Sequence, residues 1–466
     1  MPITKKNLIS SCLYSLMNVF MFMLLVFNQD KFDLITYLAF FQLLISVLLI
    51  AYINKKLFTI AALFLILSFL FHFGQSIIIS FGFNDVYAHR NVLSETSYEL
   101  YIKSEIFTFI SHFFLTIGMV YAPNFYQKTL SNEHEEDIML RKLKIISLTV
   151  ICISIIPLIY LDILKLLAVR TSGYLSTYST YSSGINKYLG LIAQFCRPAI
   201  TMFLISIKKE NKKNKIIFIL SSIYYIVMML SGDRGTNMIY LLANIFVYYK
   251  IIKQVKVRTI IYASIAGYIL LGFISSINIL RSSADMSFEA FISYFAIRSK
   301  DGIIYSTLRE FGGTIKTLCY AIQFIPSYTN YNYGLTYIFS WLIISPVLPE
   351  KIINLFNTNF TFVNAFPESY QYSLGGSYLG ELFFNFGWIG SFFAIFIGAF
   401  VGFINNLIEN SIKKNNWLIF SICMILFPNL LLWIRGYFVE LIFKVFWLGF
   451  FTLIMYYSSD LKKKEQ

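Results

Sequence analysis

Long apolar runs recur along almost the whole chain, and they constrain its fold more than any other feature. The hydrocarbon core of a bilayer is about 30 Å thick, so a helix that crosses it needs about 20 apolar residues. Runs of approximately this kind cover residues 8–27, 34–53, 57–80, 104–122, 145–166, 188–207, 216–230, 238–250, 259–280, 378–404, 417–434 and 441–457. The sequence therefore predicts an all-α polytopic membrane protein with about 12 transmembrane helices, in a single domain over residues 1–466.

Composition supports the membrane class and excludes others. The chain is 57% hydrophobic and only 13% charged, whereas about a quarter of the residues of a soluble protein are charged. The formal net charge of +14 does not indicate nucleic acid, because the lysines cluster where apolar runs end, as orientation signals do. The cysteines and histidines show no metal-ligand spacing. We therefore expect no metal, no cofactor and no nucleic-acid partner.

The distribution of basic residues predicts the orientation. If both termini lie in the cytoplasm, 22 of the 38 basic residues fall on short cytoplasmic connections. Positive charge accumulates on that side of a membrane protein. The same orientation makes residues 281–377 one large extracytoplasmic loop, long enough to hold short helices and a site for a large polar substrate.

A short glycine-flanked turn, Ser231–Gly235, joins two of the shorter apolar runs. It contains Asp233 and Arg234, and an arginine at membrane depth costs about 2.5 to 3.5 kcal/mol. Arg234 also opens the next predicted helix, where free amide groups favour an anion. We interpret Arg234 as a phosphate or diphosphate ligand; the alternative is a local ionic turn between Asp233 and Arg234.

The large loop carries further arginines. Arg298, Asp301, Tyr305 and Arg309 share one face of a predicted helix. Guanidinium groups bind two phosphate oxygens at once and stay charged, so the pair of arginines predicts a diphosphate clamp. The alternative is an amphipathic helix whose basic stripe meets lipid headgroups. Arg281 lies at the same outer boundary, as a further ligand or as a snorkelling anchor.

A tyrosine- and asparagine-rich stretch follows, with Tyr328, Tyr331 and Tyr333. Tyrosine offers a flat apolar face with a hydroxyl at its rim, and asparagine adds donors and acceptors. The combination suits a sugar ring. A tyrosine belt at the membrane interface is the equally weighted alternative.

Glu381 stands inside an apolar run, where a carboxylate is expensive unless it is protonated, paired or in a wet cavity. We interpret it as a general base that accepts a proton from a hydroxyl. The alternative is a structural pair with Arg197 or Arg435. Arg435 lies at the outer turn between the last two runs, and Arg197 lies inside the sixth run, with the same two interpretations.

The chain lacks the motifs that activate a substrate. It has no Asp-x-Asp pair of the kind that holds a metal on a nucleotide sugar and no Walker loop, and chemistry outside the membrane has no access to ATP. The energy must therefore already lie in the substrate, as in a lipid diphosphate leaving group. Arginines would stabilise the departing charge without a metal.

Three features together resemble the Wzy-type O-antigen or capsule polymerases. They are the GDRG turn, the late external loop with its arginines, and GGSYLGELFFNFGWIG at the start of the following run. The resemblance implies a bacterial inner-membrane glycosyltransferase with a GT-C-like fold, which moves a growing glycan from undecaprenyl diphosphate to a new lipid-linked repeat unit. It assigns functional arginines to Arg234, Arg281, Arg298 and Arg309, and the acidic span residue to Glu381.

Two other activities remain as alternatives. A flippase for lipid-linked oligosaccharides also has about twelve spans, but it should show two similar halves. A ligase for finished glycan resembles the polymerases in topology, but its external histidine has no evident counterpart. The expected partners are undecaprenyl-diphosphate-linked oligosaccharides, membrane lipids, a chain-length regulator and a flippase.

Overall fold

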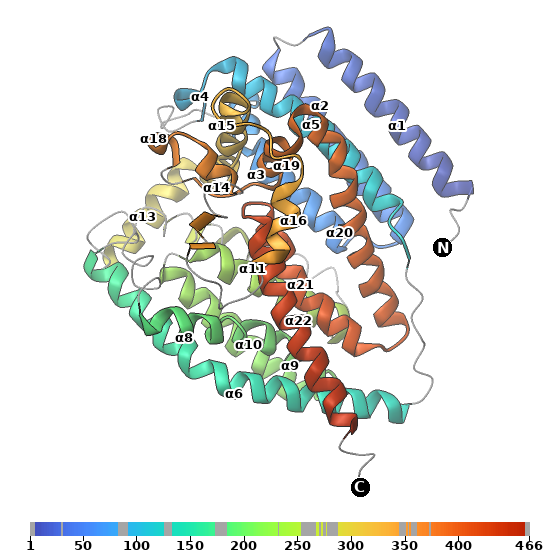
Figure 1. Ribbon diagram of the computed structural model, residues 1–466, viewed down its shortest axis with the longest axis vertical. Coiled ribbons are helices and arrows are strands. Elements are labelled where there is room, and N and C mark those ends of the chain that lie inside the picture. Colours follow the sequence, from blue (N-terminus) through green and yellow to red (C-terminus); the bar gives the residue numbers. More distant parts are fainter. Residues whose placement is uncertain are drawn as a thin grey trace. The chain divides into compact units, whose positions relative to one another are not determined.

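The computed structural model is built from helices, and all regular secondary structure in the described part of the chain is helical (Figure 1). The structure describes residues 5–28, 31–82, 92–124, 133–172, 184–231, 233–252, 267–269, 272–273, 276, 288–343, 351–352, 354–355, 361–371 and 374–461. Within them, eight helices are long and apolar enough to cross a membrane. The chain is therefore a multi-pass membrane protein, and the predicted total of twelve spans stays a prediction.

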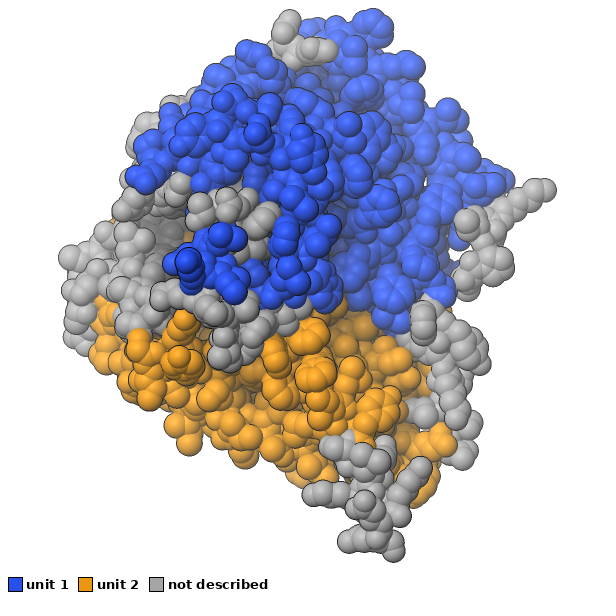
Figure 2. Space-filling view, in the orientation of Figure 1, with its two compact units in different colours: residues 1–126, 308–407, 429–444 blue, residues 127–307, 408–428, 445–466 orange. Residues whose placement is uncertain are grey.

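The chain divides into two compact units that are each discontinuous in sequence (Figure 2). Unit 1 comprises residues 1–126, 308–407 and 429–444, and unit 2 comprises residues 127–307, 408–428 and 445–466. The helices α14 (Ile303–Gly312), α20 (Gly390–Lys413), α21 (Trp417–Trp433) and α22 (Phe438–Leu461) have residues in both.

Unit 1 is formed by long membrane helices and by the short helices of the large loop. Its elements are α1 (Lys5–Val26), α2 (Phe32–Asn54), α3 (Ile60–Ser80), α4 (Val92–Glu95), α5 (Tyr98–Val120), α15 (Ile315–Phe324), α16 (Leu335–Leu342), η4 (Phe362–Ala365), α18 (Glu368–Gln371), α19 (Tyr378–Phe386) and η5 (Gly387–Ile389). The short helices α13 to α16 lie within residues 281–377, which the sequence predicts as one large loop with short helices.

Close helix packing in unit 1 depends on glycine. A Cβ atom on Gly118 would overlap the backbone of α20 at Ile395, and one on Gly398 would overlap the carbonyl oxygen of Leu115 on α5. Gly402, one turn further along α20, packs against Met119 in the same way. Small residues let membrane helices approach closely, which strengthens van der Waals contact where the hydrophobic effect cannot help.

Polar side chains also join the helices of unit 1. Gln42 of α2 donates to Asn18 of α1 at 2.7 Å and to the carbonyl oxygen of Phe109 of α5 at 3.1 Å. Tyr14 and Ser46 are hydrogen bonded at 2.8 Å. Such groups need partners inside a membrane because lipid supplies none.

Unit 2 contains α6 (Glu133–Ser172), α8 (Ile185–Ala193), α9 (Cys196–Ser206), α10 (Asn211–Met228), η2 (Met229–Ser231), α11 (Arg234–Val247), η3 (Tyr248–Ile252) and α13 (Phe288–Asp301). The helix α6 begins about three turns before the predicted run at residue 145, because its first residues are charged helix formers that hydropathy does not detect. Most of the ninth predicted run, 259–280, lies outside the described residues.

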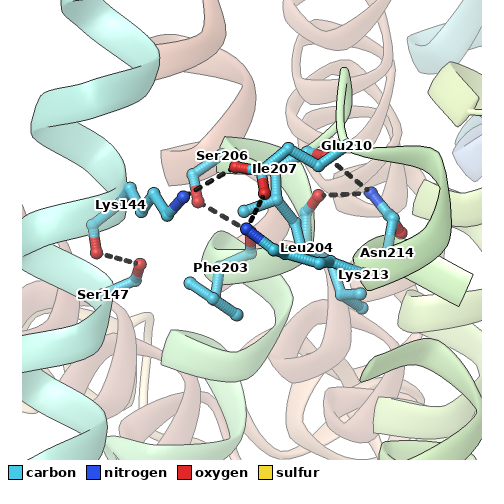
Figure 3. Close-up of polar contacts among 9 residues, drawn as sticks. All are labelled: Lys144, Ser147, Phe203, Leu204, Ser206, Ile207, Glu210, Lys213 and Asn214. Carbon is cyan, nitrogen blue, oxygen red and sulfur yellow. Dashed lines mark hydrogen bonds and ion pairs between the residues drawn. The ribbon is translucent and has the colours of Figure 1, made fainter. Parts of the chain in front are cut away.

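In unit 2, the acidic residue Glu210 forms ion pairs with two lysines (Figure 3). Glu210, in the turn between α9 and α10, accepts from Lys144 of α6 at 2.6 Å and pairs with Lys213 at 2.7 Å. The contact with Lys144 is the main reason that the pKa of Glu210 lies below its usual range. Asn214 donates to the carbonyl oxygens of Leu204 and Ile207 and closes the same turn. The lysines from which the sequence predicts the cytoplasmic side therefore also form ion pairs within unit 2.

The glycine contact between α5 and α20 gives a test of the packing. Replacement of Gly398 by Leu should destabilise the protein by about 3 kcal/mol, the upper end of ordinary overpacking, because the new side chain would meet the α5 backbone. Gly449→Leu on α22 is the control, since a Cβ there has open space around it. Thermal unfolding in detergent micelles measures both, and equal melting temperatures would contradict the proposed packing.

Candidate functional site

The predicted site residues are divided between the two units. Unit 1 contains Arg309, Tyr328, Tyr331, Tyr333, Glu381 and Arg435, and unit 2 contains Asp233 and Arg234. Arg281 lies outside the described residues. Arg298 and Asp301 lie on α13, but the description does not extend to their side chains.

Glu381 lies on α19 with a side chain that is 2% exposed. Its Oε2 atom accepts from the indole Nε1 of Trp433 at 2.8 Å, and its two oxygens accept from the backbone N–H of Phe438 at 3.0 and 3.2 Å. Phe438 is the first residue of α22, so the carboxylate binds free amide at a helix N-terminus, where negative charge is favoured. These contacts, rather than an arginine, are its partners among the described residues.

Paired glycines bring Arg435 close to α19. A Cβ on Gly376 would overlap the carbonyl of Gly436, and one on Gly375 would lie 3.7 Å from the Cγ and Nε atoms of Arg435. Thr317 of α15 donates to the Gly375 carbonyl at 3.2 Å and holds this segment in place. The paired glycines of the GGSYLGE sequence thus let the segment that leads to Glu381 pack closely against the backbone of Arg435 and Gly436.

The start of α19 is anchored by buried histidine contacts that the sequence did not reveal. Nδ1 of His72 donates to the Ser68 carbonyl at 2.8 Å, which leaves Nε2 to accept from the Ser377 hydroxyl at 3.0 Å. Ser68 in turn contacts His112 at 2.8 Å and the Tyr378 hydroxyl at 2.7 Å. The sequence indicates no metal-ligand spacing among the histidines; in the fold, His72 and His112 hold the start of α19 against α3 and α5.

The tyrosine-rich stretch lies along the other end of α19. The backbone N–H of Asn332 and that of Tyr333 donate to the carbonyls of Phe384 and Asn385 at 3.0 and 2.9 Å. Tyr328 and Tyr333 are 63% and 75% exposed, so their rings are available to a ligand. Tyr331 is partly buried, with its ring against Gly387 and Phe383.

Arg309 lies on α14 and is 9% exposed. The sequence placed it on one continuous helical face with Arg298 and Asp301. Gly302 instead adopts a φ of 93°, which only glycine takes readily, and it separates α13 from α14. Gln75 of α3 donates to the Arg309 carbonyl at 3.0 Å, so the backbone at Arg309 is fixed to the membrane helices of unit 1.

In unit 2, helix α11 begins at Arg234, as the glycine-flanked turn predicts. Asp233 pairs with Lys165 of α6 at 3.2 Å, so its contacts extend beyond the local turn. Burial opposes the ionisation of Asp233, but the charges of Lys165 and Arg197 outweigh it and lower its pKa to about 2. Arg234 is 8% exposed, so the turn holds a buried cation beside a carboxylate that stays ionised.

One acidic residue of unit 1 was not predicted. Glu105 of α5 is fully buried and accepts from the hydroxyl of Ser76, which also contacts Tyr101 at 3.0 Å. Ser104, which directly precedes Glu105 on α5, donates to Cys319 at 3.2 Å. The signal was present, because Glu105 is a carboxylate inside the predicted run 104–122 and such residues are functional candidates.

Together these features define a polytopic helical membrane protein with charged and aromatic groups held rigidly at helix ends. The chain belongs to the O-antigen polysaccharide polymerase Wzy family, whose model matches residues 10–465. This match confirms the resemblance that the motifs indicate. No curated protein and no solved structure matches the chain.

The ion pair of Asp233 can be tested through pH. Asp233→Asn should lower the free energy of unfolding at pH 7 by about 2 kcal/mol, because the folded-state pKa of Asp233 lies below its ordinary value of 3.8. The stabilisation is present above the ordinary value and is lost as the pH falls toward about 2. Thermal unfolding measures this effect. The melting temperature of the variant should lie below that of the wild type by a larger difference at pH 7 than at pH 3.

Asp137→Asn is the control, since this carboxylate of unit 2 forms an exposed ion pair with Lys209. Exposed pairs contribute little, so we expect a small change. A difference in melting temperature between wild type and Asp233→Asn that is the same at pH 7 and pH 3 would contradict the assigned ion pair.

Proposed function

We propose that the protein polymerises lipid-linked oligosaccharide repeat units. The acceptor is a sugar hydroxyl of a new lipid-linked unit, and the donor is the growing glycan on undecaprenyl diphosphate. The hydroxyl oxygen forms a bond to the anomeric carbon of the donor while the bond from that carbon to the diphosphate breaks. The hydroxyl proton passes to a base, and undecaprenyl diphosphate leaves as an anion. The family match over residues 10–465 carries this proposal.

In this proposal Arg234, Arg298 and Arg309 bind the diphosphate and stabilise its departing charge without a metal. Fixed cations are most effective when they are already in place before the reaction. The burial of Arg234 and Arg309 supports such rigidity. Arg281, Arg435, Asp233 and Asp301 complete the polar surroundings of the substrate.

Glu381 is proposed as the base for the acceptor hydroxyl, with Tyr328, Tyr331 and Tyr333 along the sugar path. The carboxylate of Glu381 accepts hydrogen bonds from Trp433 and Phe438. Tyr328 and Tyr333 have exposed rings, and the backbone of Tyr333 is hydrogen bonded to the other end of α19. A carboxylate held in one position suits proton transfer, which requires the reacting atoms to be close.

We place the reaction on the extracytoplasmic side of the bacterial inner membrane, with both termini in the cytoplasm. The concentration of lysine and arginine on the short connections supports this orientation. A chain-length regulator and a flippase that delivers the repeat units are proposed as partners.

Elongation of a purified lipid-linked repeat unit by the purified protein, with a chelator present, tests the proposal. We expect a ladder of products that differ by one repeat unit, and Arg234→Ala should reduce it by at least about a hundredfold, as removal of an oxyanion-stabilising donor does. Lys209→Ala, an exposed lysine of the same unit, should leave the ladder unchanged. Transfer of the lipid-linked unit across the membrane of vesicles that contain the protein, without elongation, would instead indicate a flippase.

Glu381 can be tested with two substitutions. Glu381→Gln keeps an oxygen for Trp433 and Phe438 but cannot act as a base, so it should abolish the ladder with little change in melting temperature. Glu381→Ala removes both functions, and the loss of a buried carboxylate that binds amide groups should also lower the melting temperature. A normal ladder from Glu381→Gln would show that Glu381 only anchors α22.

A further inference from the structure

A second group of buried charges lies in unit 2, on helices that the proposed reaction does not yet use. Asp162 of α6 is 3% exposed, and Arg197 of α9 is 8% exposed. The Arg197 Nη2 atom lies 3.6 Å from Asp162 Oδ2, which is longer than a hydrogen bond. Tyr224 of α10 already donates its hydroxyl to that same Asp162 oxygen. Three helices therefore contribute to one polar cluster, which we name the Arg197 cluster.

Part of the hydrogen-bonding capacity of the Arg197 cluster has no partner in the described part of the chain. Among the described residues, Arg197 Nε and Nη2 and Asp162 Oδ1 are buried atoms with no hydrogen-bond partner. Buried polar groups of this kind are rare in proteins, because leaving one unsatisfied costs about 1–3 kcal/mol. The cluster thus presents two donors and one acceptor to a molecule that can both accept and donate hydrogen bonds.

The sixth predicted span is irregular near Arg197. Helix α8 ends at Ala193 and α9 begins at Cys196, although Gln194 and Phe195 between them keep right-handed helical backbone angles and Ile185–Ser206 is one candidate span. Pro198 explains the irregularity, since its ring displaces the carbonyl four residues earlier and it has no N–H to donate. Arg197 therefore lies in the first turn of α9, beside this irregularity.

The charge of the cluster identifies the class of ligand. Arg197 lies close enough to Asp162 and Asp233 to interact with both electrostatically, and Asp233 is paired with Lys165. Within the Arg197 cluster one guanidinium thus faces one carboxylate, and Asp233 is neutralised separately by Lys165. A balanced site does not attract a diphosphate, but hydroxyl groups satisfy a carboxylate and a guanidinium together. Arg234, the proposed diphosphate ligand, directly follows Asp233 in the chain.

We propose that Asp162, Arg197 and Tyr224 bind the hydroxyl groups of the sugar that is attached to the diphosphate of the lipid-linked glycan. This inference rests on the proposed function and extends it to a sugar subsite in unit 2. Asp162 accepts from one hydroxyl, Arg197 donates to an adjacent oxygen, and Tyr224 holds Asp162 in position.

The test measures binding of two probes to the full-length protein. The first is the lipid-linked repeat unit purified from cells that lack the protein, and the second is undecaprenyl diphosphate without sugar. The variant Asp162→Asn with Arg197→Gln removes both charges together, which avoids an uncompensated buried ion. Its affinity for the repeat unit should fall at least about tenfold, while its affinity for undecaprenyl diphosphate should not change.

Two further variants make the result specific. Arg197→Lys keeps a cation opposite Asp162 but lacks the planar fork of donors, so it should fold and still lose affinity for the repeat unit. The control replaces Lys250 and Glu409 by glutamine, which neutralises an ion pair of unit 2 whose members are 2.5 Å apart. This control should bind both probes as the wild type does.

Equal weakening for both probes would overturn the proposal in favour of a diphosphate site. Unchanged binding of the repeat unit by Arg197→Lys and by the double variant would overturn it in favour of an ion pair that serves folding alone. The outcome is separate from the proposed reaction, because wild-type protein that binds the repeat unit but never elongates it would contradict the polymerase activity while leaving the sugar subsite intact.

Discussion

Charged groups inside a membrane must be compensated within the protein, and this requirement shapes both units. Lipid offers no hydrogen bonds, so each buried carboxylate or guanidinium needs partners from neighbouring helices. Glu381 meets the requirement through Trp433 and the first amide of α22. Asp233 meets it through Lys165. The partners come from segments distant in sequence, so the same contacts that neutralise charge also fix helix ends relative to one another within each unit.

This arrangement supports the proposal that the protein stabilises an anionic leaving group with its own side chains. The contacts around α19 leave little freedom to the segment that carries Glu381, because Ser377, Tyr378 and the paired glycines are each held by other helices. Rigid placement of polar groups is the main source of electrostatic catalysis. In unit 2, Arg234 follows a carboxylate that is itself held by α6. The polar groups of both units are thus oriented before a substrate binds.

The sequence predicted the helical membrane class and the family, since apolar runs and the GGSYLGE and GDRG motifs are local signals. It also predicted the start of α11 at Arg234. It did not predict the break between α13 and α14, although Gly302 was a visible signal. The length of α6 was missed because its first turns are charged rather than apolar.

Contacts between distant residues were beyond the sequence. Glu381 was interpreted as a general base, with an arginine pair as the alternative; its hydrogen-bond partners are an indole and a backbone amide, and no local pattern specifies such a choice. Likewise Asp162 and Arg197 lie on different helices, and only the folded chain brings them together. The roles of His72 and His112 in holding α19 depend on Ser377 and Tyr378, about three hundred residues away.

We propose that Tyr328 in unit 1 and Thr236 in unit 2 each face the extracytoplasmic side, as the distribution of basic residues predicts. Single cysteines at Tyr328 in unit 1 and at Thr236 in unit 2, in a protein whose native cysteines are replaced, allow a direct measurement with a membrane-impermeant maleimide on intact cells. Both positions should react from outside, whereas a cysteine at Lys56 should react only after lysis. Protection of either position until the cells are lysed would contradict it.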